Sequence, residues 1–172
     1  MADMKGLKIR VIQSDLFVSM IEALGANPTP MPFPEVYGGL EQKAIDGQEN
    51  PFSVILANKF FEVQKFLAVT NHQYNPQSLI VSKKVWDTLA PADQKILQDA
   101  AVEASRFQRQ TNRDAAAGQL DQLKKAGMTV TEFSPAEQAK LREKFKPVIE
   151  KHGAAISATV AEMQAELGKL RK

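Results

Sequence analysis

An arginine near the amino terminus is the side chain of this sequence best placed for chemistry. Arg10 lies between two apolar residues in GLKIRVIQ, whose alternation and β-branched residues predict a strand over residues 7–13. Because a guanidinium is costly to bury unpaired, Arg10 needs an anion or an acceptor nearby. Gln13 and Ser14 lead into a predicted helix, whose N-terminus offers free N–H groups that suit a carboxylate beside the guanidinium fork. A structural ion pair between Arg10 and a nearby Asp or Glu fits the same residues equally well.

Two further residues stand out at the ends of short motifs. Phe33 ends the proline-rich stretch NPTPMPF, and its default interpretation is a core aromatic. AIDGQENPF, residues 44–52, is interpreted as a turn between helices in which Asn50 caps the helix that begins near Pro51. The spacing of its oxygen-bearing side chains is not that of a calcium loop, so we expect no metal there.

Motifs for enzymatic chemistry are absent from the sequence. It has no cysteine, no glycine-rich phosphate loop, no G-x-S-x-G turn and no H-E-x-x-H. Its two histidines, His72 and His152, lie far apart and are interpreted as strand-end or surface residues. We therefore expect neither an enzyme nor a bound cofactor.

The composition is that of a globular protein with room for a core. The 172 residues are 44% hydrophobic and 24% charged. The net charge is +2, from 22 basic and 20 acidic residues, and does not indicate the basic surface that binds nucleic acid. No run approaches the roughly 20 apolar residues of a membrane-spanning helix. The start, MADMKGLKIRV, lacks the apolar region of a secretory signal. We expect no direct insertion into a membrane.

The elements that would position these side chains alternate between strand and helix. Period-two patterns predict strands, and a 3.6-residue period with helix-start and helix-end residues predicts helices. The predicted strands cover 7–13, 65–72, 77–82 and 128–133, with an edge strand or connector over 27–33. The predicted helices cover 14–25, 34–45, 51–64, a short helix around Trp86, and a segment from Pro91 to about Lys125 that is broken only by Gly118. Two more helical stretches follow a capping box at Ser134 and Glu137, and the first is kinked or ended by Pro147. Such alternation indicates an α/β fold.

Three long blocks of the sequence resemble one protein family. KGLKIRV, ALGANPTPMPFPEVYGGLEQKAIDGQENPF and KFFEVQKFLAVTNHQYNPQSLIVSKK are similar to the solute-binding proteins of TRAP transporters (tripartite ATP-independent periplasmic, the DctP-type family). The similarity runs from about Lys5 to the C-terminus. It implies a periplasmic-binding-protein-like fold of type II, in the periplasm. It also implies capture of an organic acid anion between two α/β domains and its delivery to a membrane permease.

The resemblance also implies roles for individual residues. Arg10 corresponds to the arginine that pairs with the ligand carboxylate, and Gln13 to a residue that lines the pocket. Phe33 corresponds to the aromatic residue that packs on the ligand, and Asn50 to the asparagine that hydrogen-bonds it. Two positions depart from the family pattern. Ile12 stands where many relatives have proline, which could change the pocket beside Gln13, and Pro34 replaces a serine.

The ligand stays open between two classes of organic acid. A four-carbon dicarboxylate is one, and a sugar acid is the other, for which Gln13, Ser14 and Asp15 would supply partners for hydroxyl groups. A sensor or interaction module built on the same fold is the alternative function.

Family members are nearly twice as long as this chain. The resemblance therefore implies their C-terminal part, with most of the first domain outside the chain. We expect a ligand-binding α/β domain to begin in residues 5–75. A segment returning to the first domain, a long connecting helix and a C-terminal part packed on the ligand-binding domain follow in residues 76–90, 91–127 and 128–172. The face that would meet the absent half should be exposed and prone to association.

Overall fold

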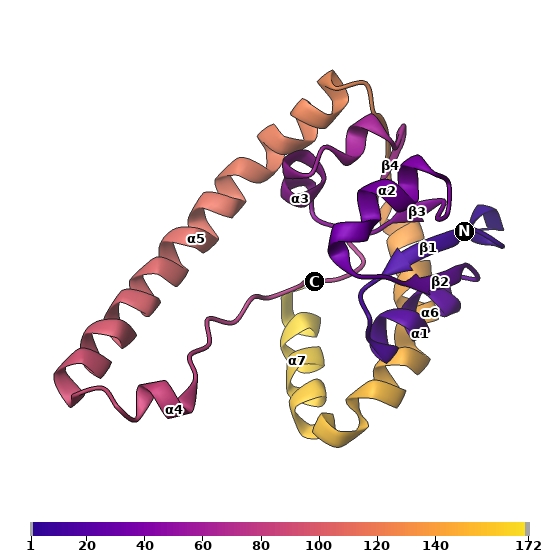
Figure 1. Ribbon diagram of the computed structural model, residues 1–172. Coiled ribbons are helices and arrows are strands. Elements are labelled where there is room, and N and C mark those ends of the chain that lie inside the picture. Colours follow the sequence, from indigo (N-terminus) through magenta and orange to yellow (C-terminus); the bar gives the residue numbers. More distant parts are fainter. Residues whose placement is uncertain (1, 171–172) are drawn as a thin grey trace.

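The first sheet contains three short parallel strands. The computed structural model describes residues 2–170 and places this sheet in a packed body from which a long helix extends (Figure 1). Its strand order is β2-β1-β3, with β1 at Lys8–Val11, β2 at Asn27–Pro30 and β3 at Gly47–Gln48. The proline-rich β2 lies at the outer edge, as the sequence predicts, because proline cannot donate to a ladder on both sides.

Helices connect the strands of this sheet. After the 3₁₀ turn η1 (Ala2–Met4), helix α1 (Asp15–Ala23) joins β1 to β2 and ends before Gly25, which has a φ of +87°. The 3₁₀ turn η2 (Phe33–Glu35) and helix α2 (Val36–Glu41) join β2 to β3. Helix α3 (Phe52–Ala57) and the turn η3 (Phe60–Glu62) then lead to the second sheet.

The second sheet pairs two strands that are far apart in the sequence. β4 (Phe66–Val69) and β5 (Thr129–Glu132) run parallel. Between them lie the short helix α4 (Lys83–Trp86) and α5 (Pro91–Lys125), which confirms the predicted long helix, although Gly118 does not break it. The chain finishes with α6 (Pro135–Gly153), the turn η4 (Ala154–Ile156) and α7 (Ser157–Leu170). The parallel strands and covering helices confirm the α/β class.

Clusters of buried apolar side chains hold the two sheets and their helices together. The largest cluster joins α2, α3, β4 and the end of α5, through Val36, Leu40, Ile45, Ile55, Phe60, Leu67, Leu123 and Met128. A second cluster lies between β1 and α1. A third joins α1 to α6 through Met20, Leu141 and Phe145. The end of the chain thus packs back on its beginning.

Several predicted elements differ from the structure. Residues 77–82 form no strand within the described chain, and they pair with neither of its two sheets. The helix predicted over 51–64 breaks after α3, where Lys59 takes a left-handed φ of +54°. Helix α6 continues through Pro147 to Gly153, so that proline does not end it.

The turn predicted for residues 44–52 contains a strand. Gly47 and Gln48 form β3, which pairs with β1. Two residues are too few to give a period-two pattern, so the sequence carries no strand signal there.

Candidate functional site

The predicted site residues gather at one edge of the first sheet. Arg10 lies near the carboxyl end of β1, Phe33 follows β2, and Asn50 follows β3. Because all three strands are parallel, their carboxyl ends share one edge, which is where ligands bind in open α/β sheets. The fold thus brings together residues that are up to 40 positions apart in the sequence.

Arg10 is buried and bonded to a backbone carbonyl. Its side chain is 3% exposed, and its Nε and Nη2 donate to the carbonyl oxygen of Met31 at 3.0 and 2.8 Å. No carboxylate of the described residues lies within 4.0 Å of the guanidinium, so the predicted structural ion pair is wrong. Burial lowers the pKa of Arg10, and the charge of Glu49 opposes this change. An arginine remains charged in this situation.

One edge of the guanidinium is left for another partner. Met31 occupies the side formed by Nε and Nη2, and within residues 2–170 no hydrogen bond reaches Nη1. The Nη1–Nη2 edge can present two parallel N–H groups, which is the geometry that binds a carboxylate.

Phe33 lies over this arginine and is open to solvent. The Phe33 ring centroid is 5.7 Å from Cζ of Arg10, and the ring tilts against Phe60 with 6.0 Å between centroids. The side chain is 40% exposed, so its default interpretation as a core aromatic is wrong. The cause lies in β2, which ends at the sheet edge and leaves the following turn at the surface.

Asn50 bonds to a neighbour in its own segment and caps no helix. Its Nδ2 donates to Oε1 of Gln48 at 2.6 Å. Pro51 holds the N-cap position of α3 without a side-chain cap bond, so the predicted cap by Asn50 is wrong. Gln48 is the register partner of Arg10 across β1 and β3, so the two residues lie next to each other in adjacent strands. Gln48 carries no signal in the sequence, because β3 is too short to give a strand pattern.

Gln13 and Ser14 follow β1 at the same edge. Gln13 is exposed, and Ser14 is half-buried at the N-cap of α1 without a side-chain cap bond. No hydrogen bond joins either residue to Arg10 in the part of the chain described. Their roles at a ligand stay predictions.

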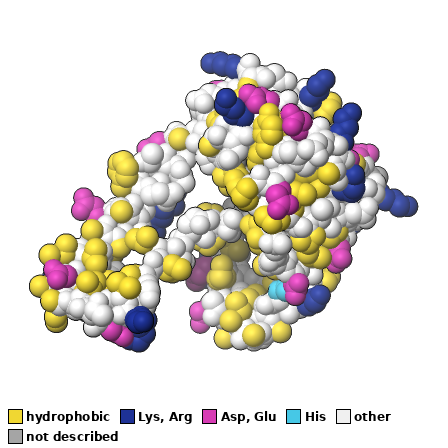
Figure 2. Space-filling view, viewed as in Figure 1, with side chains coloured by type: hydrophobic (Ala, Val, Ile, Leu, Met, Phe, Trp, Pro, Cys, Tyr) yellow, Lys and Arg dark blue, Asp and Glu magenta, His cyan; other side chains and the backbone are white. Residues whose placement is uncertain are grey.

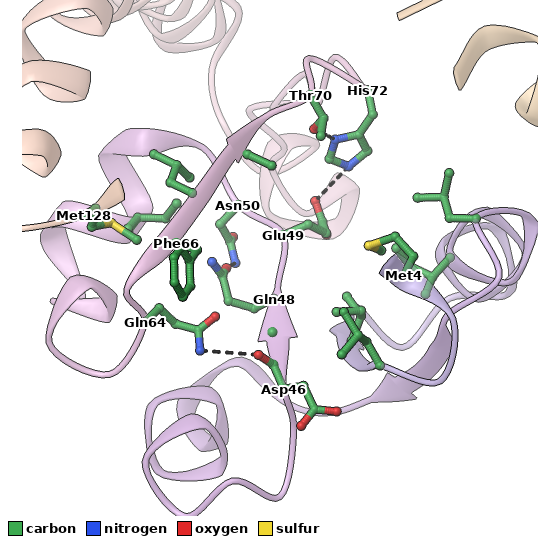
Figure 3. A pocket seen from close by; sticks show the side chains of 18 of the residues that line it. Met4, Asp46, Gln48, Glu49, Asn50, Gln64, Phe66, Thr70, His72 and Met128 are labelled. Carbon is green, nitrogen blue, oxygen red and sulfur yellow. Dashed lines mark hydrogen bonds and ion pairs between the residues drawn. The ribbon is translucent and has the colours of Figure 1, made fainter. Parts of the chain in front are cut away.

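A polar cluster that the sequence did not indicate lies beside Asn50. Nδ1 of His72 is 2.7 Å from Oγ1 of Thr70, and its Nε2 is 3.6 Å from Oε2 of Glu49 (Figure 3). His72 follows β4, as predicted for a strand-end residue, but its side chain is only 17% exposed, and Nε2 has no hydrogen-bond partner among residues 2–170. His152, by contrast, bonds to Ser19 and helps to join α6 to α1.

Two hollows meet at this cluster. One, of about 390 Å³, lies between β3 and β4 and is lined by residues of both (Figure 3). The other, of about 340 Å³, reaches Asn112 and Gln119 of α5. Glu49, Asn50 and His72 line both hollows, whereas Arg10 and Phe33 line neither.

Other kinds of site find little support in the described chain. Residues 2–170 contain no group of three His, Cys, Asp or Glu side chains able to hold a metal ion. None of the described helices combines the length and apolar composition required to cross a membrane.

Relatives of known structure or name match almost the whole chain. The 2,3-diketo-L-gulonate-binding periplasmic protein of Escherichia coli K12 is 40% identical over 169 residues, 95% of this chain and 51% of the relative. A TRAP periplasmic solute-binding protein from Ochrobactrum anthropi, with its C-terminus bound in the ligand-binding pocket, is 48% identical with a TM-score of 0.85, covering 99% of this chain and 53% of that one. A Bradyrhizobium protein in complex with α/β-D-galacturonate is 38% identical with a TM-score of 0.89, covering 95% and 55%.

The chain spans about half the length of these relatives. A family model described as bacterial extracellular solute-binding protein, family 7 (DctP), matches residues 1–155. On this match, and as its sequence motifs predict, the chain belongs to the DctP family of TRAP-transporter solute-binding proteins.

Proposed function

We propose that this chain carries the carboxylate anchor of a TRAP-transporter solute-binding protein. The observation that supports this most is the guanidinium of Arg10, which is buried and charged and has one edge that no described residue bonds. A carboxylate on that edge would receive two charge-assisted hydrogen bonds in a site partly screened from water. Phe33, 5.7 Å from Cζ, would cover the ligand from the solvent side.

The polar groups beyond the anchor favour a sugar acid over a four-carbon dicarboxylate. Gln48 and Asn50 offer amide donors and acceptors beside Arg10, and the Glu49–His72 pair lies next to them. A sugar acid has several hydroxyl groups that such side chains can bind, whereas a dicarboxylate would place a second charge near Glu49. Two of the relatives above are named for binding 2,3-diketo-L-gulonate and galacturonate. Family membership supports a location in the periplasm and delivery of the ligand from there to a membrane permease.

Titration of the labelled chain with galacturonate, followed by NMR, tests the anchor. NMR detects weak binding, which is expected because the chain spans only half of a full-length relative and its site stays open to water. We expect galacturonate to shift the Nε–H resonance of Arg10 and the backbone amides of Phe33 and Asn50. Shifts confined to other residues, or none at millimolar ligand, would contradict the proposal.

A pair of conservative variants isolates the geometry of the guanidinium. Arg10→Lys keeps the charge but loses the planar fork, and we expect it to weaken binding by about 10-fold to 100-fold. Arg142→Lys makes the same change at an exposed position of α6 and should leave the affinity unchanged. Equal affinities for Arg10→Lys and the wild type would rule out bidentate pairing.

A further inference from the structure

A single backbone carbonyl holds the guanidinium of Arg10 within the described chain. The carbonyl oxygen of Met31 accepts two hydrogen bonds, from Nε at 3.0 Å and from Nη2 at 2.8 Å. This oxygen therefore occupies one side of the planar guanidinium. The edge formed by Nη1 and the second N–H of Nη2 faces a different direction. The direction of one carbonyl thus decides which edge of Arg10 a ligand can meet.

The direction of that carbonyl depends on one backbone angle. Rotation about the Cα–C bond of Met31, its ψ angle, turns the carbonyl oxygen and leaves the N–H where it is. The N–H of Met31 donates to the carbonyl of Val11 at 3.2 Å, which continues the pairing of β1 with β2 past Pro30. This bond places Met31 beside β1 but does not fix its ψ. A second restraint is needed to direct the carbonyl at Arg10.

The proline at position 32 supplies that restraint. A proline ring clashes with the preceding residue in the α region and restricts the ψ of that residue to about +120 to +160°. Met31 precedes Pro32, which is itself extended, with a φ of −55° and a ψ of 143°. Pro32 therefore narrows the ψ of Met31 to the extended range whether or not a ligand is bound.

Pro32 contributes little else to the structure. Its side chain is exposed. The hydrogen bond that shapes the following turn runs from the N–H of Glu35 to the carbonyl of Pro32 at 3.1 Å, and any residue at position 32 can accept it. A proline has no N–H, so its replacement removes no donor. The main loss on replacement is the restriction on Met31.

The side chain of Met31 provides a further restraint. It packs against the largest core cluster, and its Sδ and Cε lie against Gly39 of α2. A Cβ at position 39 would be only 3.3 Å from both atoms, whereas an ordinary carbon contact is about 3.5–4.0 Å. Gly39 thus leaves the space that the thioether fills. At Gly38, one position earlier, a Cβ would have no neighbour within 4 Å.

We propose that Pro32 and Met31 are positioning residues for the carboxylate anchor. Pro32 sets the direction of the Met31 carbonyl, and this carbonyl turns the Nη1–Nη2 edge of Arg10 toward the ligand. Both residues act through Arg10, so their role rests on the proposed function of that arginine. An unrestrained arginine samples several rotamers, and a ligand must then select the one that presents the correct edge. Holding the guanidinium beforehand removes that cost.

Solvent exchange of the Nε–H proton of Arg10, measured by NMR without ligand, tests the first step. In the wild type, the bond to Met31 protects this proton. Pro32→Ala frees the ψ of Met31, so the proton should exchange at least about tenfold faster. Pro28→Ala is the matched control, because it loosens only Asn27 at the other end of β2. We expect wild-type exchange in that variant.

A glycine pair tests the same step from the side of the core. Gly39→Ala pushes on the thioether of Met31, and the Nε–H of Arg10 should exchange about threefold faster. Gly38→Ala makes the same change in the same helix without this contact and should leave the exchange unchanged. Both variants replace a helical glycine with a better helix former, so neither should unfold the chain. Equal exchange in the two would contradict the role of the Met31 side chain.

The affinity for galacturonate tests the second step. Pro32→Ala should weaken binding by about fivefold, because the guanidinium is present but no longer held in the correct direction. Pro28→Ala should bind as the wild type does. Circular dichroism spectra that match the wild type show that both variants are folded.

Two outcomes would overturn the proposal. Equal Nε–H exchange in Pro32→Ala and Pro28→Ala would mean that Pro32 only shapes the turn. Faster exchange in Pro32→Ala with an unchanged affinity would mean that the bond to Met31 does not prepare the anchor. The exchange measurement contains no ligand, whereas failure of the carboxylate anchor appears as absent galacturonate binding in the wild type. The two failures are therefore distinguishable.

Discussion

The body and the arm of this molecule differ in what they bury. The body, residues 8–70 and 119–153, holds every buried hydrophobic side chain of the described chain. The arm, residues 74–114, contains no buried residue at all. Figure 2 shows hydrophobic side chains gathered on the far end of the arm, around α4 and the start of α5. The chain thus combines a body with a buried apolar core and an arm whose apolar side chains are exposed to solvent.

The arm does not have the composition of a flexible linker. Its exposed large hydrophobic residues include Leu79, Ile80, Ile96, Leu97 and Phe107. A disordered segment would be poor in such residues, and a monomer seldom exposes many of them together. The two regions therefore differ in where their large apolar side chains lie: the body buries them, and the arm exposes them.

Truncating one phenylalanine in each region gives the largest expected contrast. Phe60 is 2% exposed in the main core, and Phe107 is 72% exposed on α5. Phe60→Ala should lower the free energy of unfolding by about 3–5 kcal/mol, because it leaves a cavity. Phe107→Ala should change it by less than about 0.5 kcal/mol. Urea unfolding measures both. A similar loss for the two variants would mean that the arm is packed in solution.

Helices and strands of both regions were predictable from the sequence where they depend on residues close together in the chain. The helix from Pro91 to Lys125 and the capping box at Ser134 depend on neighbouring residues, and both are confirmed. The strand predicted over residues 77–82 is wrong, because a strand needs a partner that the sequence pattern does not show.

The site was predictable only in part for the same reason. Arg10 stands out as a charge in an apolar strand, and its burial follows from that setting. Its actual partner, the carbonyl of Met31, carries no residue-type signal. Gln48 and the contact between Glu49 and His72 depend on strand pairing across the sheet edge, which single-sequence patterns do not reveal.

Self-association gives the next contrast between the regions. If the exposed apolar side chains of the arm bind another protein surface, the chain at high concentration should associate with itself through the arm. The double variant Ile80→Ser with Phe107→Ser should weaken that association by at least about 100-fold, since each of the two buried side chains contributes about 1.5–3 kcal/mol and about 1.4 kcal/mol is tenfold. Leu16→Ser, at an exposed apolar residue of α1 in the body, should have little effect. Sedimentation velocity measures the association of both variants. Equal effects of the two variants would mean that the chains associate through a surface other than the arm.

The smallest contrast concerns how helices begin in the two regions. In the body, α6 begins with a capping box, in which Oγ of Ser134 accepts from the N–H of Glu137 at 3.3 Å and donates to its carboxylate at 2.7 Å. In the arm, α5 begins after Ala90, which has no side chain for capping. Ser134→Ala should lower the free energy of unfolding by about 1 kcal/mol at neutral pH. Ser14→Ala should cost less, because Ser14 makes no cap bond to α1.

The cost of Ser134→Ala should also depend on pH. The hydrogen bonds from the side chain and the backbone of Ser134 lower the pKa of Glu137 from its ordinary value of 4.5. A carboxyl whose pKa is lower in the folded state stabilises the fold above its unfolded pKa, and this contribution is lost as the pH falls through the folded value. The difference between wild type and Ser134→Ala should therefore shrink below pH 4.5. It should not vanish, because the bond from the N–H of Glu137 to Oγ does not titrate. Urea unfolding across this range measures the difference, and a difference that grows on acidification would contradict the role of the carboxylate.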